Sequence, residues 1–352
     1  MKIGLLSMQK VINYGSFLQA YALKKTIEEL GHTVYFIDIR PGNQILDSQT
    51  KSRRNIKIDR FILKRVEHII FKKRRESSFI NNYFHDIGIN TPVSEEECDA
   101  IVIGSDEVLN CCQPSLWGFS AQLFGDTVKP SITYAASCGY TDVEKLKEIG
   151  KEKEVIKALN KLKKISVRDE NTYTFVQKLT GKLPEQHLDP VLIFDWNKIA
   201  LNQTKYKDYI LVYAYDNRIV DEHEIMAIKS FAKKARKKLI SFGVYQRWCD
   251  LNVECSPFEL ISYFDSADYV ITDTFHGTVI SIKRNKKFAT LIRKSNKNKL
   301  QSLLNFFGLE SRAVEDMQSL PETIKRDIDY ETINQRIEQE RERTINYLRN
   351  EL

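Results

Sequence analysis

The sequence predicts an α/β protein made of two consecutive halves, and three observations lead to this fold class. Short apolar runs typical of buried parallel strands alternate with segments whose apolar residues recur at helical spacing. A strand, a helix and a second strand follow one another in residues 2–40, which indicates a βαβ unit. A chain of 352 residues also exceeds the size of one ordinary hydrophobic core.

The first half begins with an apolar strand at 2–8, a helix at 15–31 capped by Gly31, and a second strand at 32–40. The later elements expected in this half are strands at 99–106 and 131–139, a charged helical stretch at 143–164, and a strand–turn–helix unit at 165–181.

A polar segment at 197–208 marks the junction between the halves. We therefore expect an N-terminal domain over 1–196, a C-terminal domain over 197–330 and a final helix over 331–352. The elements expected after the junction are strands at 209–215, 239–245, 268–274 and 286–293, and helices at 221–238, at 256–267 and after Gly277. Ligands of open α/β sheets bind beyond the carboxyl ends of the strands, so two such domains facing each other would hold substrate in the cleft between them.

Composition and charge exclude several classes of protein. The six cysteines form no CxxC pair and no zinc-like spacing with histidine, so we expect reduced thiols and no metal. No apolar run reaches the roughly 18 residues of a membrane span, and residues 1–15 indicate a first strand instead of a secretion signal. These features predict a cytoplasmic protein.

The net charge of +7 is concentrated in residues 51–75, where eleven Lys and Arg face only Asp59 and Glu67. Apolar residues recur there every three to four positions, which favours a helix with an apolar stripe. One interpretation is a solvated helix packed on the first domain. The other is a helix that binds the anionic inner face of the cytoplasmic membrane. No nucleic-acid-binding module is recognisable, so we expect no nucleic acid partner.

Polar residues follow the expected strands at three places. In the first, Asn13, Tyr14, Gly15 and Ser16 join a strand to a helix, and Gly15 would let an anion approach the helix amides. A plain βα turn explains this loop equally well.

Arg168 follows the second such strand, where its guanidinium suits a carboxylate or a phosphate. An ion pair with Asp169 or Glu170 is the alternative. His276 follows the third strand as a candidate general acid, with Gly277 and Thr278 opening a helix that would hold phosphate. The alternative for His276 is a purely structural role.

Taken in order, seven motifs make the chain resemble the polysaccharide pyruvyl transferase family from about residue 3 to residue 312. The motifs are NYGSFLQAYAL, IVIGSDEVLN, YAASCG, ISVRDENT, LDPVLI, ADYVITDTFHGTVISI and NKLQSLLNFFGLESR. This resemblance implies two Rossmann-like domains facing a cleft, as in GT-B glycosyltransferases, with a C-terminal helix that returns to the first domain. It also implies an enzyme that moves pyruvate from phosphoenolpyruvate onto a sugar as a ketal, without a cofactor or an essential metal.

The resemblance also implies roles for individual residues. His276 would donate a proton to the donor, and Arg168 and Lys299 would bind its anionic groups, with Lys297 or Arg293 as substitutes for Lys299. The other donor contacts expected are Thr274, Gly277 and Thr278. Asp106 and Asp273 are the candidate bases for the sugar hydroxyl, although either is equally suited to form a turn.

Departures from the family pattern leave the acceptor open. Thr274 stands where some relatives have arginine, Ser16 where others have aspartate, and Leu109 where tryptophan is frequent. We expect the acceptor to be a sugar of a capsular or exopolysaccharide precursor on a polyprenyl diphosphate. The alternatives are a GT-B glycosyltransferase that uses a nucleotide sugar, and a non-enzymatic scaffold in polysaccharide assembly.

Overall fold

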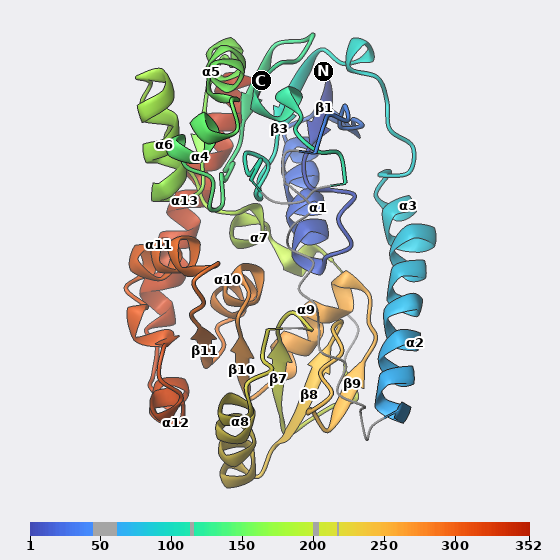
Figure 1. Ribbon diagram of the computed structural model, residues 1–352, viewed down its shortest axis with the longest axis vertical. Coiled ribbons are helices and arrows are strands. Elements are labelled where there is room, and N and C mark those ends of the chain that lie inside the picture. The colour runs from blue at the N-terminus through green and yellow to red at the C-terminus, as the bar shows by residue number, and fades with distance from the viewer. Residues whose placement is uncertain (45–61, 113–115, 200–203, 217) are drawn as a thin grey trace.

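Two parallel sheets divide the chain into an N-terminal and a C-terminal half (Figure 1). The computed structural model describes residues 1–44, 62–112, 116–199, 204–216 and 218–352. Both halves are of the expected α/β class, and their strands come from either side of the polar segment at 197–208. The expected domain limits at 196 and 330 stay predictions.

The first sheet has the strand order β2-β1-β3-β4, with every neighbouring pair parallel. Its strands are β1 (Lys2–Leu6), β2 (Thr33–Phe36), β3 (Ala100–Ile103) and β4 (Ser131–Thr133). A short parallel pair, β5 (Ser166–Val167) and β6 (Glu185–Gln186), continues beyond β4 through the bridge between Ala136 and Val167. The central strands β1 and β3 are apolar and mostly buried, as expected for a parallel sheet.

The helices of the N-terminal half include those that the sequence predicts, together with the short helices α3 (Phe84–Asp86) and α7 (Pro190–Ile193), which it does not predict. The others are α1 (Tyr14–Glu29), α2 (Ile62–Ser78), α4 (Val143–Glu148), α5 (Glu152–Lys161) and α6 (Glu170–Thr180). A π-helix (Phe79–Tyr83) joins α2 to α3, and 3₁₀ turns lie at Glu95–Glu97, Ala121–Phe124 and Trp196–Lys198. The charged stretch at 143–164 is two helices because Gly150 adopts a left-handed conformation (φ +66°) and ends α4.

The second sheet has the order β12-β11-β10-β7-β8-β9 and is also wholly parallel. Its strands are β7 (Tyr209–Tyr213), β8 (Lys238–Phe242), β9 (Leu251–Val253), β10 (Tyr269–Thr272), β11 (Phe288–Leu291) and β12 (Ala313–Val314). The edge strands β9 and β12 are too short to give a sequence signal and were not expected.

Helices flank the second sheet as well. They are α8 (Glu222–Ala235), α9 (Pro257–Ser266), α10 (Phe275–Lys283), α11 (Lys297–Phe307), α12 (Leu320–Lys325) and α13 (Tyr330–Glu351), with 3₁₀ turns at Glu310–Arg312 and Met317–Ser319. The helix expected after Gly277 begins earlier, at Phe275, because the Thr274 side chain caps it. His276 therefore lies in the first turn of a helix and not in the loop before it.

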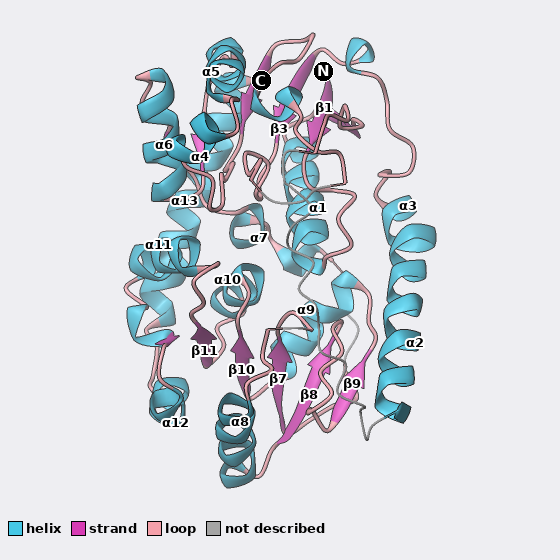
Figure 2. Ribbon diagram, in the orientation of Figure 1, coloured by secondary structure: helices cyan, strands magenta, loops and turns pink. Residues whose placement is uncertain are grey.

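The carboxyl ends of both sheets point toward the middle of the molecule (Figure 2). Helices α1, α7, α9 and α10 fill the space between them, and one hydrophobic core runs through this region from Leu5 to Phe264. Tyr14 of α1 donates a hydrogen bond to the Cys255 carbonyl across the interface (2.8 Å). The helical layer is thus shared by both halves.

The C-terminal helix α13 returns to the first domain, as expected. Tyr330 at its start packs on the C-terminal half, where its hydroxyl donates to the Lys286 carbonyl. Near its end, Tyr347 donates to the carbonyl of Thr133 at the end of β4 (2.8 Å), and Thr344 bonds to the Tyr134 hydroxyl (3.0 Å). A single helix therefore braces both domains.

The basic segment at 51–75 falls only partly within the described residues. Residues 51–61 lie outside them, and the rest form most of α2, which is helical as expected. Although α2 precedes β3 in the chain, it lies beside β9 of the C-terminal half (Figure 1). Within the described ranges, no helix combines the length and apolar character needed to cross a bilayer.

The bracing role of α13 leads to a stability prediction. Leu348 is fully buried in the shared core, so Leu348→Ala should lower the free energy of unfolding by about 2–5 kcal/mol. The exposed neighbour Glu342→Ala should change it by less than about 0.5 kcal/mol. Urea denaturation measures both. Equal effects of the two variants would show that α13 does not depend on this contact.

Candidate active site

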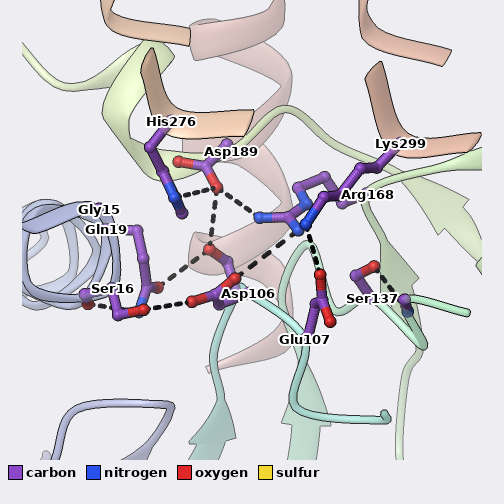
Figure 3. Close-up of polar contacts among 12 residues, drawn as sticks. Gly15, Ser16, Gln19, Asp106, Glu107, Ser137, Arg168, Asp189, His276 and Lys299 are labelled. Atoms are coloured by element: carbon purple, nitrogen blue, oxygen red, sulfur yellow. Dashed lines mark hydrogen bonds and ion pairs between the residues drawn. The ribbon is translucent and has the colours of Figure 1, made fainter. Parts of the chain in front are cut away.

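Asp189 forms the centre of a polar cluster between the domains (Figure 3). One carboxylate oxygen accepts the Val191 amide (3.0 Å) and so caps α7. The other lies 2.8 Å from Arg168 Nη1, 3.4 Å from His276 Nε2 and 3.4 Å from Ser105 Oγ. Burial alone would raise the pKa of Asp189, but His276 and Arg168 outweigh it and lower the pKa to about 2. The cluster therefore holds a permanent carboxylate.

His276 reaches this carboxylate from the first turn of α10 in the opposite domain. Its ring also packs on the backbone of Gly15, where the Cβ atom of any other residue would lie 2.2 Å from His276 Nδ1. Only glycine leaves room for the imidazole at this point. The contact explains why the α1 loop needs Gly15.

Arg168 enters the cluster from the end of β5, and only 3% of its side chain is exposed. Its guanidinium stacks 4.0 Å from the Phe275 ring centroid and lies 3.8 Å from Asp106 Oδ1. Burial disfavours the charge, but Asp189 and Asp106 outweigh it and raise the pKa of Arg168. Among the described residues, none accepts a hydrogen bond from Arg168 Nε or Nη2.

Asp106 follows β3 and adopts a left-handed backbone conformation (φ 79°), which is unfavourable for a residue other than glycine. Ser16 Oγ, in the first turn of α1, donates a 2.7 Å hydrogen bond to its carboxylate. The strained turn thus points a carboxylate at the interdomain space beside Arg168.

Lys299 and Glu107 form a second ion pair across the domains, 2.5 Å apart. Burial would raise the pKa of Glu107, but Lys299 lowers it to about 2, and Asn110 donates a further hydrogen bond (2.7 Å). Glu107 likewise overcomes the effect of burial on Lys299 and raises its pKa. Both groups remain charged at neutral pH.

Two cavities flank this cluster. The first, of about 630 Å³, lies between the domains and is lined by the carboxylates Asp106 and Glu107 and by Ser16, His276, Arg218, Lys299, Trp117, Tyr140 and Tyr215. The second, of about 600 Å³, is lined by Arg168, Asp189, Tyr173, Gln186, Phe306 and Arg343. Phe275 and Lys299 line both cavities, so the two meet at these side chains.

The amides that were expected to hold an anion at the first loop have a partner within the loop itself. The Asn13 side chain already accepts the amides of Gly15 (2.8 Å) and Ser16 (3.2 Å). Tyr14 is buried in the interface, away from the cavity that Asn13 and Ser16 line. The close approach that Gly15 permits is made by His276 and not by an anion.

The groups of Gly277 and Thr278 that were expected to contact phosphate have partners within the protein. The Gly277 amide donates to Thr274 Oγ1 (2.9 Å), and the Thr278 amide donates to the Thr274 carbonyl (3.2 Å). The Thr278 hydroxyl bonds to Thr290 (2.9 Å). Thr274, Gly277 and Thr278 are buried and hold α10 in place, which in turn holds His276.

Of the two candidate bases, only Asp106 lines the cavity. Asp273 is fully buried behind it, and its nearest cation is Arg218, with Nε 4.0 Å from the carboxylate. Burial raises the pKa of Asp273 to about 6, although Arg218 and Arg293 oppose the shift. Asp273 therefore cannot touch a ligand in the cleft without rearrangement.

Lys299 lines both cavities and is therefore better placed to contact a ligand than its two proposed substitutes, Arg293 and Lys297. Arg293 forms an ion pair with Glu224, and Lys297 lies 3.6 Å from Glu315 on the surface. Neither lines the cavities beside His276.

Sequence reasoning missed Asp189, Glu107 and Arg218. The LDPVLI motif contains a signal for Asp189, because an aspartate before a proline at a helix start is a typical cap. Glu107 and Arg218 lie in loops, and their partners come from distant segments, so no local pattern identifies them.

Two Rossmann-like domains that face a cleft, with charged groups at the carboxyl ends of both sheets, define a GT-B-type fold. A model of the family described as polysaccharide pyruvyl transferase matches residues 13–295. The match covers most of the chain, so the protein belongs to the polysaccharide pyruvyl transferase family and is a transferase of that family.

Solved structures with a similar fold share little sequence identity with this chain. The S. aureus MnaA–UDP structure is 10% identical over 98% of this chain and 95% of that one, with a TM-score of 0.53. Arabidopsis thaliana UGT89C1 with quercetin is 9% identical over 99% of both chains (TM-score 0.48). The glycosyltransferase SnogD from Streptomyces nogalater is 12% identical over 99% of this chain and 98% of that one (TM-score 0.44). A search of curated proteins gave no match.

The contact between Gly15 and His276 predicts a specific loss of activity. The added methyl group of Gly15→Ala would displace the imidazole, so we expect transfer to slow by about 100-fold. The same change made in His276→Ala should have no further effect on the rate, because the displaced group is absent. Additive losses in the double variant would show that Gly15 acts independently of His276.

The low pKa of Asp189 predicts a pH-dependent contribution to stability. An unfolded aspartate has a pKa of about 3.9. The folded value is about 2, so Asp189 contributes stability above pH 4 that is lost as the pH falls toward 2. The difference in unfolding free energy between wild type and Asp189→Asn should therefore shrink by about 2–3 kcal/mol between pH 5 and pH 2. Urea denaturation at several pH values tests this, and a constant difference would contradict it.

Proposed function

We propose that this transferase moves the pyruvyl group of phosphoenolpyruvate onto two hydroxyls of one sugar, forming a pyruvate ketal. The sugar belongs to a capsular or exopolysaccharide precursor carried on a polyprenyl diphosphate. The observation that carries the proposal is the buried guanidinium of Arg168, which has two nitrogens without acceptors among the described residues and lies next to a histidine–carboxylate pair.

The donor carries a carboxylate and a phosphate, and it needs cations for both. Buried N–H groups without partners are costly and often mark the place of a ligand. The anion would lie where the two cavities meet, in reach of Arg168 and Lys299. Arg218, on the first cavity and stacked 4.5 Å from the Tyr215 ring centroid, is the third cation.

His276 is the proposed proton donor. The Asp189 carboxylate, 3.4 Å from its Nε2, orients the ring and stabilises the imidazolium. A proton from His276 goes to C3 of the enol phosphate, and C2 becomes an oxocarbenium-like centre. Because a positive charge develops at C2, the nearby Asp106 and Glu107 carboxylates also stabilise this state.

Asp106 is the proposed base for the acceptor. It lines the cleft beside Ser16, and Trp117 and Tyr140 on the same cavity offer flat faces for a sugar ring. One sugar hydroxyl attacks C2, the C2–O bond to phosphate breaks, and a second hydroxyl closes the ketal. Of the two hydroxyl protons, one restores His276 and the other leaves with inorganic phosphate, so the atoms and charges balance.

Binding and transfer can be tested separately. Phosphoenolpyruvate should raise the melting temperature of the wild type, and Arg168→Lys should weaken this shift because lysine lacks the guanidinium fork. The matched control Arg293→Lys, which changes an arginine outside the two cavities, should bind normally. His276→Gln should keep donor binding and lose about 10²–10⁴-fold in transfer rate.

The product is read by mass spectrometry of lipid-linked oligosaccharides incubated with donor, which should gain the mass of pyruvate less water. Stabilisation by UDP- or GDP-sugars without any effect of phosphoenolpyruvate would overturn the proposal in favour of a glycosyltransferase. Donor binding with transfer that survives His276→Gln would overturn only the role of the histidine.

A further inference from the structure

One side of α2 holds the helix against the C-terminal domain. Glu67 accepts a hydrogen bond from the Tyr245 hydroxyl (2.8 Å), and His68 stacks on the same ring (centroids 5.1 Å apart). Phe71 meets that ring edge-on, and Arg75 donates to the Gly243 carbonyl (3.2 Å). These contacts fix the rotation of the helix about its axis, and therefore fix which side chains point outward.

The outward side combines apolar and basic residues. Val66, Ile69 and Ile70 are 47%, 49% and 44% exposed, and Ile80 in the following π-helix is 50% exposed. Helical spacing places Arg65, Lys73 and Arg74 on the same side, and all three are exposed. Figure 1 shows α2 at the edge of the molecule, beside β9. Residues 62–78 hold six Lys and Arg against two Glu.

We propose that this outward face of α2, residues 65–80, binds the surface of an anionic phospholipid bilayer. The basic side chains would contact headgroup phosphates, and the isoleucines and valine would enter the boundary with the acyl chains. Charge complementarity decides for a lipid surface, because the six basic residues of α2 outnumber its two carboxylates. Of these, Glu67 accepts a hydrogen bond from Tyr245, and Glu76 lies 3.9 Å from Lys72. Grouped exposed Ile and Val residues also mark an interaction surface and not ordinary solvent exposure.

The rigid attachment gives this contact a consequence for the enzyme. Since α2 is bound to the C-terminal domain, a bilayer on its outer face would hold that domain at one fixed orientation. This inference goes beyond the proposed reaction and does not depend on the donor or the acceptor. Binding of this kind would bring the enzyme to a membrane surface, where a lipid-linked acceptor would be available.

Vesicle sedimentation of the full chain tests the proposal. The wild type should sediment with vesicles of phosphatidylcholine and phosphatidylglycerol, remain in solution with pure phosphatidylcholine, and be released by 1 M salt. The triple variant R65E/K73E/R74E should bind roughly 100-fold more weakly or worse. The variant V66S/I69S/I70S should also bind less, while keeping its salt dependence.

The matched control is K229E/K233E/K234E, which makes the same charge change on the exposed side of α8. It should bind like the wild type, and circular dichroism should show that all variants are folded. Unchanged binding of R65E/K73E/R74E, equal loss in the α8 control, or no binding to either vesicle type would overturn the proposal. Because the assay contains neither phosphoenolpyruvate nor acceptor, failure here leaves the proposed reaction untouched, and failure of the reaction leaves this surface untouched.

Discussion

The buried carboxylate of Asp189 is the interaction on which the site depends. A carboxylate removed from water is costly unless cations and hydrogen bonds surround it. Here the arginine comes from the same domain and the histidine from the other one, and both reach a single oxygen atom. The site is therefore complete only when the two domains are packed together as they are here.

The surrounding structure makes this arrangement specific. Gly15 leaves space for the imidazole, the Thr274 cap begins α10 at the residue before His276, and α7 is placed by its cap, Asp189. The same three elements belong to the helical layer between the sheets. Helix α13 connects that layer to both domains, so the distance between Arg168 and His276 is set by packing and not by flexible loops.

Charged residues gather in two regions with different surroundings. The cleft contains matched pairs, in which Glu107 neutralises Lys299 and Asp189 neutralises Arg168. An anionic ligand in the cleft would compete with these carboxylates for the cations. Its specificity would come from the Arg168 nitrogens Nε and Nη2, which have no acceptor among the described residues. The exposed basic residues of α2 are not buried in matched pairs of this kind. Electrostatic attraction to an anionic surface would depend only on how many basic residues there are and how they are spaced.

The order of strands and helices was determined by the sequence alone, because buried parallel strands and amphipathic helices each impose their own apolar period on a local stretch of chain. Local pattern also located Arg168 and His276, since polar residues after buried strands collect at one edge of a sheet, whereas Lys299 was expected only from the family resemblance. What only the tertiary structure decided is which partners these residues meet. Asp189 lies 87 positions before His276 in the sequence. The choice between the candidate bases Asp106 and Asp273 likewise required the structure, because Asp106 lines the cleft and Asp273 is fully buried behind it. Contacts between such distant segments depend on how the two domains pack. The spacing of apolar residues along a local stretch of chain carries no information about that packing.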